Sequence, residues 1–204
     1  MALVVATLKN DVKAAFRATD WTVCATQLAQ AIDSFIKSGI ANTTVTGIVT
    51  PPFPMPPYSA VGSGGAAPGQ TSNITTTGLA ALQAQITAKF MSSSTMWADL
   101  GSAIATAISS DVATATINTT VTGALTGTGV GNPGCINDSG GLSGLIANLT
   151  AAFTTQAYDT DWNNVADKIG DSLDQYLKAA TVTTIDNGTI PPNSWAGSGT
   201  GTIS

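Results

Sequence analysis

The chain has 204 residues, of which 43% are hydrophobic and only 9% are charged, and its net charge is −5 at pH 7. The seven basic residues are scattered, which excludes the concentrated positive surface that nucleic-acid binding needs. No apolar run approaches the about 20 residues that cross a bilayer, and the N-terminus lacks the basic-then-apolar order of a secretory signal. We therefore expect a protein made in the cytoplasm, without nucleic-acid or membrane partners, whose weakly charged surface is largely covered by other proteins.

Internal repetition is the strongest pattern in the sequence. Three tryptophans, Trp21, Trp97 and Trp162, each begin a helical pattern, and each is followed at the same spacing by a glycine. The string Asn-Thr-Thr-Val-Thr-Gly occurs at residues 42–47 and again at 118–123. Such self-similarity predicts a tandem triplicate, and repeats of this size are marginal for independent cores, so we expect one cooperative unit. The predicted repeats are residues 1–66, 67–140 and 141–204.

Each repeat is predicted to begin with a short amphipathic helix. Its apolar residues recur at i, i+4 and i+8, which places them on one helix face. They are Leu8, Val12 and Phe16; Leu82, Ile86 and Phe90; and Leu145, Leu149 and Phe153. A connector of variable length follows, and its last residues predict the N-cap of a second helix: Thr19-Asp20, Thr95-Met96 and Thr160-Asp161. Capping explains Asp159 and Asp161 without a bound metal ion.

The second helix of each repeat is predicted to begin at the tryptophan. Apolar residues follow three, seven and eleven positions later, again on one face. They are Cys24, Leu28 and Ile32; Leu100, Ile104 and Ile108; and Val165, Ile169 and Leu173. We expect Trp21, Trp97 and Trp162 to be buried structural anchors, because aromatic residues at helical spacing belong to cores more often than to binding sites. Asp111 replaces the aromatic residue of the other repeats, which predicts a more exposed or differently partnered helix end.

The pattern then changes from helical to extended. Three β-branched, glycine-punctuated segments predict one or two short strands each, with a turn or bulge at the glycine. They are residues 41–50, 117–125 and 182–190. Beyond them, residues 58–65 and 195–204 are rich in Gly, Ser and Thr, and we expect extended arms that only a partner orders. Tyr58 and Trp195 are the aromatic residues of these arms and the candidate partner-binding residues.

These elements predict an α+β fold class. Three tandem helix-helix-strand repeats are expected to pool their helices into one six-helix core. Short β-strands and extended Gly/Pro/Thr-rich arms are expected to leave this core.

The residues that carry most enzyme chemistry are missing from the sequence. There is no His and no Glu, so the commonest general base and metal ligand is absent. The Gly-rich stretches continue neither into the Lys-Ser/Thr of a phosphate-binding loop nor into a dinucleotide-binding helix. We therefore expect no enzyme activity, no bound metal and no cofactor.

The two cysteines favour a reduced chain. Cys24 occupies the position held by Leu100 and Val165 in the other repeats, which indicates a small core residue. Cys135 lies in a Gly-rich loop that has no counterpart elsewhere in the chain. A disulfide between Cys24 and Cys135 stays open as the alternative, although proteins made in the cytoplasm rarely form one.

The last repeat resembles a known class of proteins. The helix that begins at Trp162 ends in Tyr-Leu-Lys-Ala-Ala and continues into Thr-Val-Thr-Thr, and the chain closes with Gly-Ser-Gly-Thr-Gly-Thr-Ile-Ser. This order resembles small virion structural proteins of tailed bacteriophages, such as those of phages that infect cyanobacteria. These commonly combine a Leu-containing helix, an aliphatic-x-x-x-Ile-x-x-Tyr-Ile-Lys helix and Thr/Val/Gly-rich extended ends. The middle repeat departs from the pattern at Asp111 and lacks the Pro-Pro pair of the outer repeats.

The resemblance implies a non-enzymatic structural component of a phage particle, made in the host cytoplasm and present in multiple copies per virion. Its expected partners are other virion proteins, namely capsid, neck or baseplate subunits. It would brace or decorate their rings through its extended arms, which add strands to neighbouring sheets. The competing interpretation is a surface or secreted carbohydrate- or host-binding module, similar to an adhesin, whose Thr-rich strands face the ligand.

Overall fold

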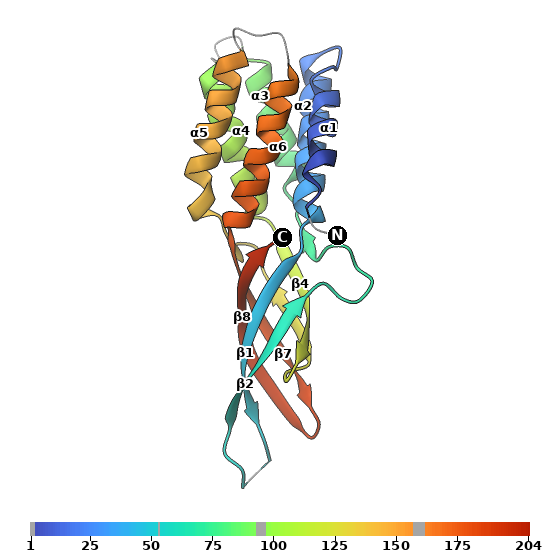
Figure 1. Ribbon diagram of the computed structural model, residues 1–204, viewed down its shortest axis with the longest axis vertical. Helices are drawn as coiled ribbons and strands as arrows, with labels where there is room; N and C mark the ends of the chain where they lie inside the picture. The colour runs from blue at the N-terminus through green and yellow to red at the C-terminus, as the bar shows by residue number, and fades with distance from the viewer. Residues whose placement is uncertain (1–2, 53, 93–96, 157–161) are drawn as a thin grey trace.

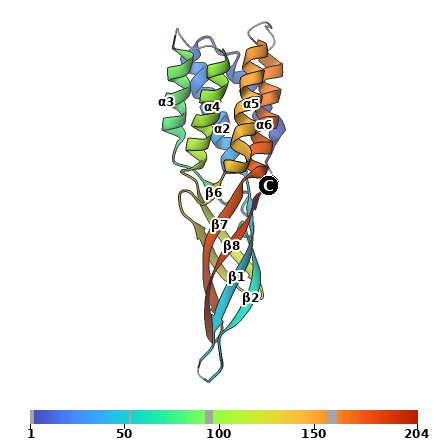
Figure 2. The same ribbon diagram turned by 90° about the vertical axis from the view of Figure 1, so that its left-hand side faces the viewer.

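The computed structural model describes residues 3–52, 54–92, 97–156 and 162–204. The molecule is elongated, with six helices side by side at one end and a slender β-barrel at the other (Figure 1, Figure 2). The chain alternates between these halves, because each pair of helices is followed by strands. Within the described part of the chain, no helix combines the length and the apolar character that a membrane span requires.

Six helices form the first half of the molecule. They are α1 (Val5–Ala15), α2 (Trp21–Ser38), α3 (Leu79–Phe90), α4 (Trp97–Val112), α5 (Ser139–Gln156) and α6 (Trp162–Ala179). Each helix packs against the next one in the sequence, and α6 packs against α1, so the six helices form a closed ring. Their apolar faces meet inside this ring in one hydrophobic core.

Burial inside the ring confirms the apolar stripes of the sequence. The nine residues that follow the tryptophans at three, seven and eleven positions are all buried, none more than 3% exposed. A Cβ at Gly101 would stand 2.5 Å from the backbone nitrogen of Thr150, so a small residue is needed where α4 meets α5. The N-cap at Asp20 is also confirmed, because its Oδ1 accepts a hydrogen bond from the Val23 amide at 2.9 Å. The other capping residues, Thr95-Met96 and Asp159 to Asp161, lie outside the described residues.

The strands form the second half of the molecule. They are β1 (Ala41–Thr50), β2 (Tyr58–Gly65), β3 (Ile74–Thr75), β4 (Thr116–Gly123), β5 (Gly127–Gly131), β6 (Ile136–Asn137), β7 (Thr181–Ile190) and β8 (Asn193–Ile203). Six of them close into an antiparallel barrel in the order β2-β1-β8-β7-β5-β4, with β4 pairing back onto β2. Hairpins β1–β2, β4–β5 and β7–β8 build this barrel. The short strand β3 pairs with β4 and directly precedes α3, and the short strand β6 pairs with β7 and directly precedes α5.

Glycine at alternate positions makes the barrel narrow. Strands β1, β4 and β7 supply most of the inward side chains, whereas β2, β5 and β8 place glycines opposite them. A Cβ at Gly129 would stand 1.8 Å from Oδ1 of Asp186, and a Cβ at Gly199 would stand 2.4 Å from Oγ1 of Thr184. Larger residues there would displace the inward side chains, so the glycines are a packing requirement of closely approaching strands.

The structure corrects the predicted fold class. The sequence indicated three helix-helix-strand repeats whose strands and arms leave a pooled six-helix core, whereas the strands and arms close into a six-stranded barrel with a hydrophobic cluster of its own. The segments expected to be partner-ordered arms are strands β2 and β8, and β8 is hydrogen-bonded on both sides, to β1 and β7. The prediction was wrong because a Gly-rich composition by itself indicates a flexible segment. In these strands the glycines stand at every second position, where they face the barrel interior and relieve crowding there. The repeat boundaries at residues 66 and 140 stay a prediction.

Candidate interaction surface

Charge is divided unevenly between the two halves of the molecule. The segments that form the barrel, residues 41–75, 116–137 and 180–204, contain one charged residue, Asp186. Its side chain is fully buried inside the barrel. We define the outer barrel wall as the outward side chains of β1, β2, β4, β5, β7 and β8, and this wall therefore carries no charge.

Neutral polar residues cover most of the outer barrel wall, and large apolar side chains lie among them. Val130 and Ile185 are paired across β5 and β7 and are 44% and 67% exposed. Ile48 and Val61 are diagonal neighbours on β1 and β2 and are 59% and 55% exposed. Depletion of charge together with exposed apolar side chains is typical of the buried centre of an interface rather than of a free surface.

The two candidate partner-binding residues lie in different environments. Tyr58, at the start of β2, pairs with the buried Val49 and so lies on the inward side of its strand, at the end of the barrel remote from the helices, where it is half exposed. Trp195 is only 3% exposed and packs inside the barrel with Val45, Val49 and Leu125. Its burial corrects the expectation that it anchors a partner, because the side chain fills the barrel instead of leaving it.

The three anchor tryptophans meet at the end of the helices that is remote from the barrel. The ring of Trp162 stacks on Phe16 with centroids 4.7 Å apart and lies 6.1 Å from Trp21 and 5.7 Å from Trp97. Trp97 and Trp162 are partly buried against the helical core. Trp21 is 43% exposed, so the expectation of a buried anchor is wrong for this residue. It lies at the rim of the aromatic cluster, where its ring contacts Phe90 and Trp162.

A polar layer separates the helical core from the hydrophobic cluster of the barrel. Thr43, Thr119 and Thr184 point inward from β1, β4 and β7 and are at most 5% exposed. Asp186 accepts hydrogen bonds from the hydroxyl of Thr184 at 2.8 Å and from that of Thr119 at 3.5 Å. The hydroxyl of Thr43 is buried without a hydrogen-bond partner. Burial raises the pKa of Asp186, and hydrogen bonds from Thr184, Thr119 and the Gly199 amide offset part of this effect.

Two further carboxylates are buried where the helices meet the barrel. Asp33 accepts hydrogen bonds from the Lys37 ammonium at 2.7 Å and from the Thr76 hydroxyl. Asp111 is 2% exposed, and no donor reaches its oxygens in hydrogen-bonding geometry. Burial, and to a smaller extent the charge of Asp33, raises the pKa of Asp111 to about 6. The nearby Lys37, the Gly78 amide and the Thr76 hydroxyl act in the opposite direction and offset only part of this increase. The predicted exposure of this helix end is therefore wrong.

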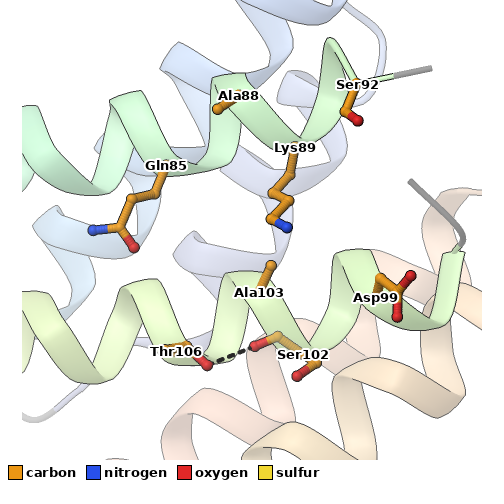
Figure 3. A pocket seen from close by; sticks show the side chains of 8 residues that line it. All are labelled: Gln85, Ala88, Lys89, Ser92, Asp99, Ser102, Ala103 and Thr106. Carbon is orange, nitrogen blue, oxygen red and sulfur yellow. Dashed lines mark hydrogen bonds between the residues drawn. The ribbon is translucent and has the colours of Figure 1, made fainter. Parts of the chain in front are cut away.

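An open groove of about 620 Å³ lies between α3 and α4 on the helical half (Figure 3). Gln85, Lys89 and Ser92 line it from α3 and its C-terminal end, and Asp99, Ser102, Ala103 and Thr106 line it from α4. The Thr106 hydroxyl is bonded back to the Ser102 carbonyl of its own helix at 2.9 Å. These lining groups include hydroxyl, ammonium and carboxylate side chains but no thiol or imidazole.

The alternative of a disulfide and the expected absence of a metal site concern the cysteines and the acidic residues. Cys24 and Cys135 are both buried and both free. Burial raises the pKa of Cys24 to about 11, with a smaller contribution from Asp20, so its thiol is protonated at neutral pH. In the described ranges, no group of three or more His, Cys, Asp or Glu side chains is placed to hold a metal ion.

The comparisons with known proteins give no relative. No protein-family model, no curated protein and no solved structure matches the chain. Sequence reasoning missed both the outer barrel wall and the buried Asp186, although one signal was present: glycine alternates with other residues at 62–64, 127–131 and 197–201, the period of a strand with one crowded face.

Proposed function

We propose that the chain is a non-enzymatic structural component of a tailed-phage particle, where it braces or decorates rings of other virion subunits in the head, neck or baseplate. The observation that carries this proposal is the outer barrel wall, which has no charge and exposes Ile48, Val61, Val130 and Ile185. The resemblance of the last helix and the closing strand to small virion proteins supports the same assignment.

An uncharged wall of this kind is costly to leave in water. Fully burying one such aliphatic side chain contributes about 1.5–3 kcal/mol, and these four side chains are all about half exposed or more. The helical half carries the remaining charges and suits contact with solvent. We therefore propose that the barrel end is the one that other virion subunits cover, with the helical end projecting from them.

Closure of the barrel changes how partners are contacted. Because β2 pairs with β4, the six barrel strands present no free edge along their paired residues to which a neighbour could add a strand. The earlier expectation of arms that extend neighbouring sheets therefore has no structural basis. Partners instead contact outward side chains of the barrel wall, such as Val61 and Ile185.

A pair of charge-introducing variants tests this assignment. Ile185 on the outer barrel wall and Met91 after α3 are similarly exposed, at 67% and 63%. We expect Ile185→Lys to lower incorporation into phage particles at least about tenfold, because it places a charge in an interface, with the melting temperature of the isolated protein unchanged. Met91→Lys is the matched control and should be incorporated normally.

Mass spectrometry of purified particles supplies the readout. The proposal requires the wild-type chain to be present at fixed stoichiometry. Its absence from particles, or equal incorporation of the Ile185→Lys and Met91→Lys variants, would contradict it. A monomeric recombinant protein that binds host cells would favour the adhesin-like alternative instead.

A further inference from the structure

The outer barrel wall is uncharged around its whole circumference. Every strand in the closed order β2-β1-β8-β7-β5-β4 presents outward side chains, and none of these side chains is charged. The one charged residue of these strands, Asp186, points inward and is fully buried. A protein bound on one side only is expected to keep charged residues on its remaining, solvated sides. The distribution of charge therefore does not single out one face of the barrel as the contact face.

The exposed apolar side chains of the wall form two patches on opposite sides of the barrel. Ile48 and Val61 lie on β1 and β2, and Val130 and Ile185 lie on β5 and β7. Strand β8 separates the two patches in one direction around the barrel, and strand β4 separates them in the other. A partner that docks against one side of a closed barrel would cover one patch and leave the other in water.

The three hairpins follow one another in the same rotational sense around the barrel. Their order is β2-β1, β8-β7 and β5-β4, so the second strand of each hairpin precedes the first. Thr43, Thr119 and Thr184 point inward from the first strands, and each pairs with a glycine of the second strand of its own hairpin. The barrel axis is thus an approximate threefold axis. Such an axis suits a ring whose rotational symmetry is a multiple of three.

The shape of the molecule fits an opening that admits only one of its ends. The barrel is the narrow end in both views, and the helical half is wider (Figure 1, Figure 2). Strands β1 and β7 have ten residues each, and such a strand spans about 33 Å. All charged residues other than Asp186 lie outside the barrel segments. The barrel could therefore enter a channel while the charged helical half stays in solvent.

We propose that the barrel occupies the central opening of a ring of identical virion subunits, which surrounds the outer barrel wall on all sides. This inference rests on the proposed function and specifies the geometry of its contact. The ring has three or six subunits, in register with the three hairpins. Its inner surface is uncharged, because a charged side chain buried against this wall would find no counter-charge.

Lysine substitutions around the circumference test this geometry. Ile48→Lys and Ile185→Lys place a charge in the two apolar patches, and Ser198→Lys on β8 and Thr122→Lys on β4 place one between them, at exposed positions. We expect each variant to lower incorporation into particles at least about tenfold, because a ring leaves no side of the barrel in solvent. Ser198→Asn and Thr122→Ser are neutral controls that should be incorporated normally. Melting temperatures of the isolated variants verify that each one folds.

The outcomes separate this inference from the proposed function. If one or more of the lysine variants were incorporated normally while the others were lost, the partner would cover one side only. That result would overturn the ring and leave the proposed function intact. Normal incorporation of all four lysine variants would overturn both.

Thiol labelling of assembled particles gives a second readout that needs no charge. Cys24 and Cys135 are buried, so an introduced cysteine supplies the reactive thiol. The variants are Ile48→Cys, Thr122→Cys, Ile185→Cys and Ser198→Cys. All four should react with a maleimide in the free protein and be protected in particles, whereas Met91→Cys on the helical half should react in both. A barrel cysteine that reacts equally fast in particles and in the free protein would overturn the ring.

The copy number of the chain provides a further check. One barrel per opening requires about one copy of the chain for every three or six copies of the ring subunit. Mass spectrometry of purified particles measures this ratio. Equal copy numbers of the chain and the ring subunit would contradict the central position of the barrel.

Discussion

The indole nitrogen of Trp195 donates a hydrogen bond to the carbonyl oxygen of Thr126 at 3.0 Å, from inside the barrel. The bond joins the start of β8 to the turn between β4 and β5, two segments far apart in the sequence. A Cβ at Gly47 would stand 2.7 Å from the Trp195 ring, so this glycine makes room for the indole. Trp195 is thus the largest side chain of the barrel's hydrophobic cluster.

Truncating Trp195 should destabilise the barrel half. We expect Trp195→Ala to lower the free energy of unfolding by about 3–5 kcal/mol, the range for large buried aromatic residues. Trp195→Phe keeps most of the ring but leaves the Thr126 carbonyl without its donor, and should cost less. Urea denaturation monitored by circular dichroism measures the loss in the free energy of unfolding for both variants. A loss below about 1 kcal/mol for Trp195→Ala would show that the indole does not support the barrel.

The aromatic cluster at the far end of the helices predicts an order among the tryptophans. Trp162 contacts Phe16, Trp21 and Trp97, so Trp162→Ala should lower the free energy of unfolding by about 3 kcal/mol or more. Trp21 is 43% exposed, and Trp21→Ala should cost only about 1 kcal/mol. Thermal unfolding of the two variants under one condition measures the difference. Equal losses would contradict the rim position of Trp21.

Asp111 should make stability depend on pH. Its pKa is raised from 3.8 to about 6 in the folded protein, so ionisation is harder in the folded than in the unfolded state. The contribution of Asp111 to the free energy of unfolding should therefore be largest below about pH 4. It should decrease by about 1–3 kcal/mol as the pH rises from about 4 to about 6, and should not change further above that pH. Asp111→Asn should remove this decrease, whereas Asp99→Asn on the exposed face of the same helix should retain it. If the Asp111→Asn variant showed the same decrease in the free energy of unfolding, another ionisable group would be responsible for it.

Hydrogen exchange distinguishes a barrel strand from a free arm. Since β8 pairs with both β1 and β7, amides of residues 195–203 in the isolated protein should be strongly protected, with slowing close to that of the helical core. Deleting residues 194–204 should also lower the melting temperature, because it opens the barrel and exposes its hydrophobic cluster. Rapid exchange of these amides in the absence of partners would restore the view of a disordered arm.

The helical half could be predicted from the sequence because its signal is local. The spacing of Leu28 and Ile32 from Trp21, and of the corresponding residues in α4 and α6, specifies one helix face, and every residue of these stripes is buried. The cap at Asp20 followed from the same local chemistry. Which of the tryptophans is most buried could not be inferred, because that depends on how the helix ends meet in the ring.

The barrel was decided by tertiary structure. Whether a Gly-rich segment is an arm or a strand depends on pairing between residues far apart in the chain, such as Gly64 with Val121 and Gly199 with Val45. The sequence contained the alternation of glycines, but not the neighbours that make those glycines necessary. The same holds for Asp186, which reads as an ordinary surface acid until closure of the strands removes it from water. Local periodicity determined the helices and their buried faces, whereas closure of the sheet determined which residues face the barrel interior, because closure is a property of all six strands together.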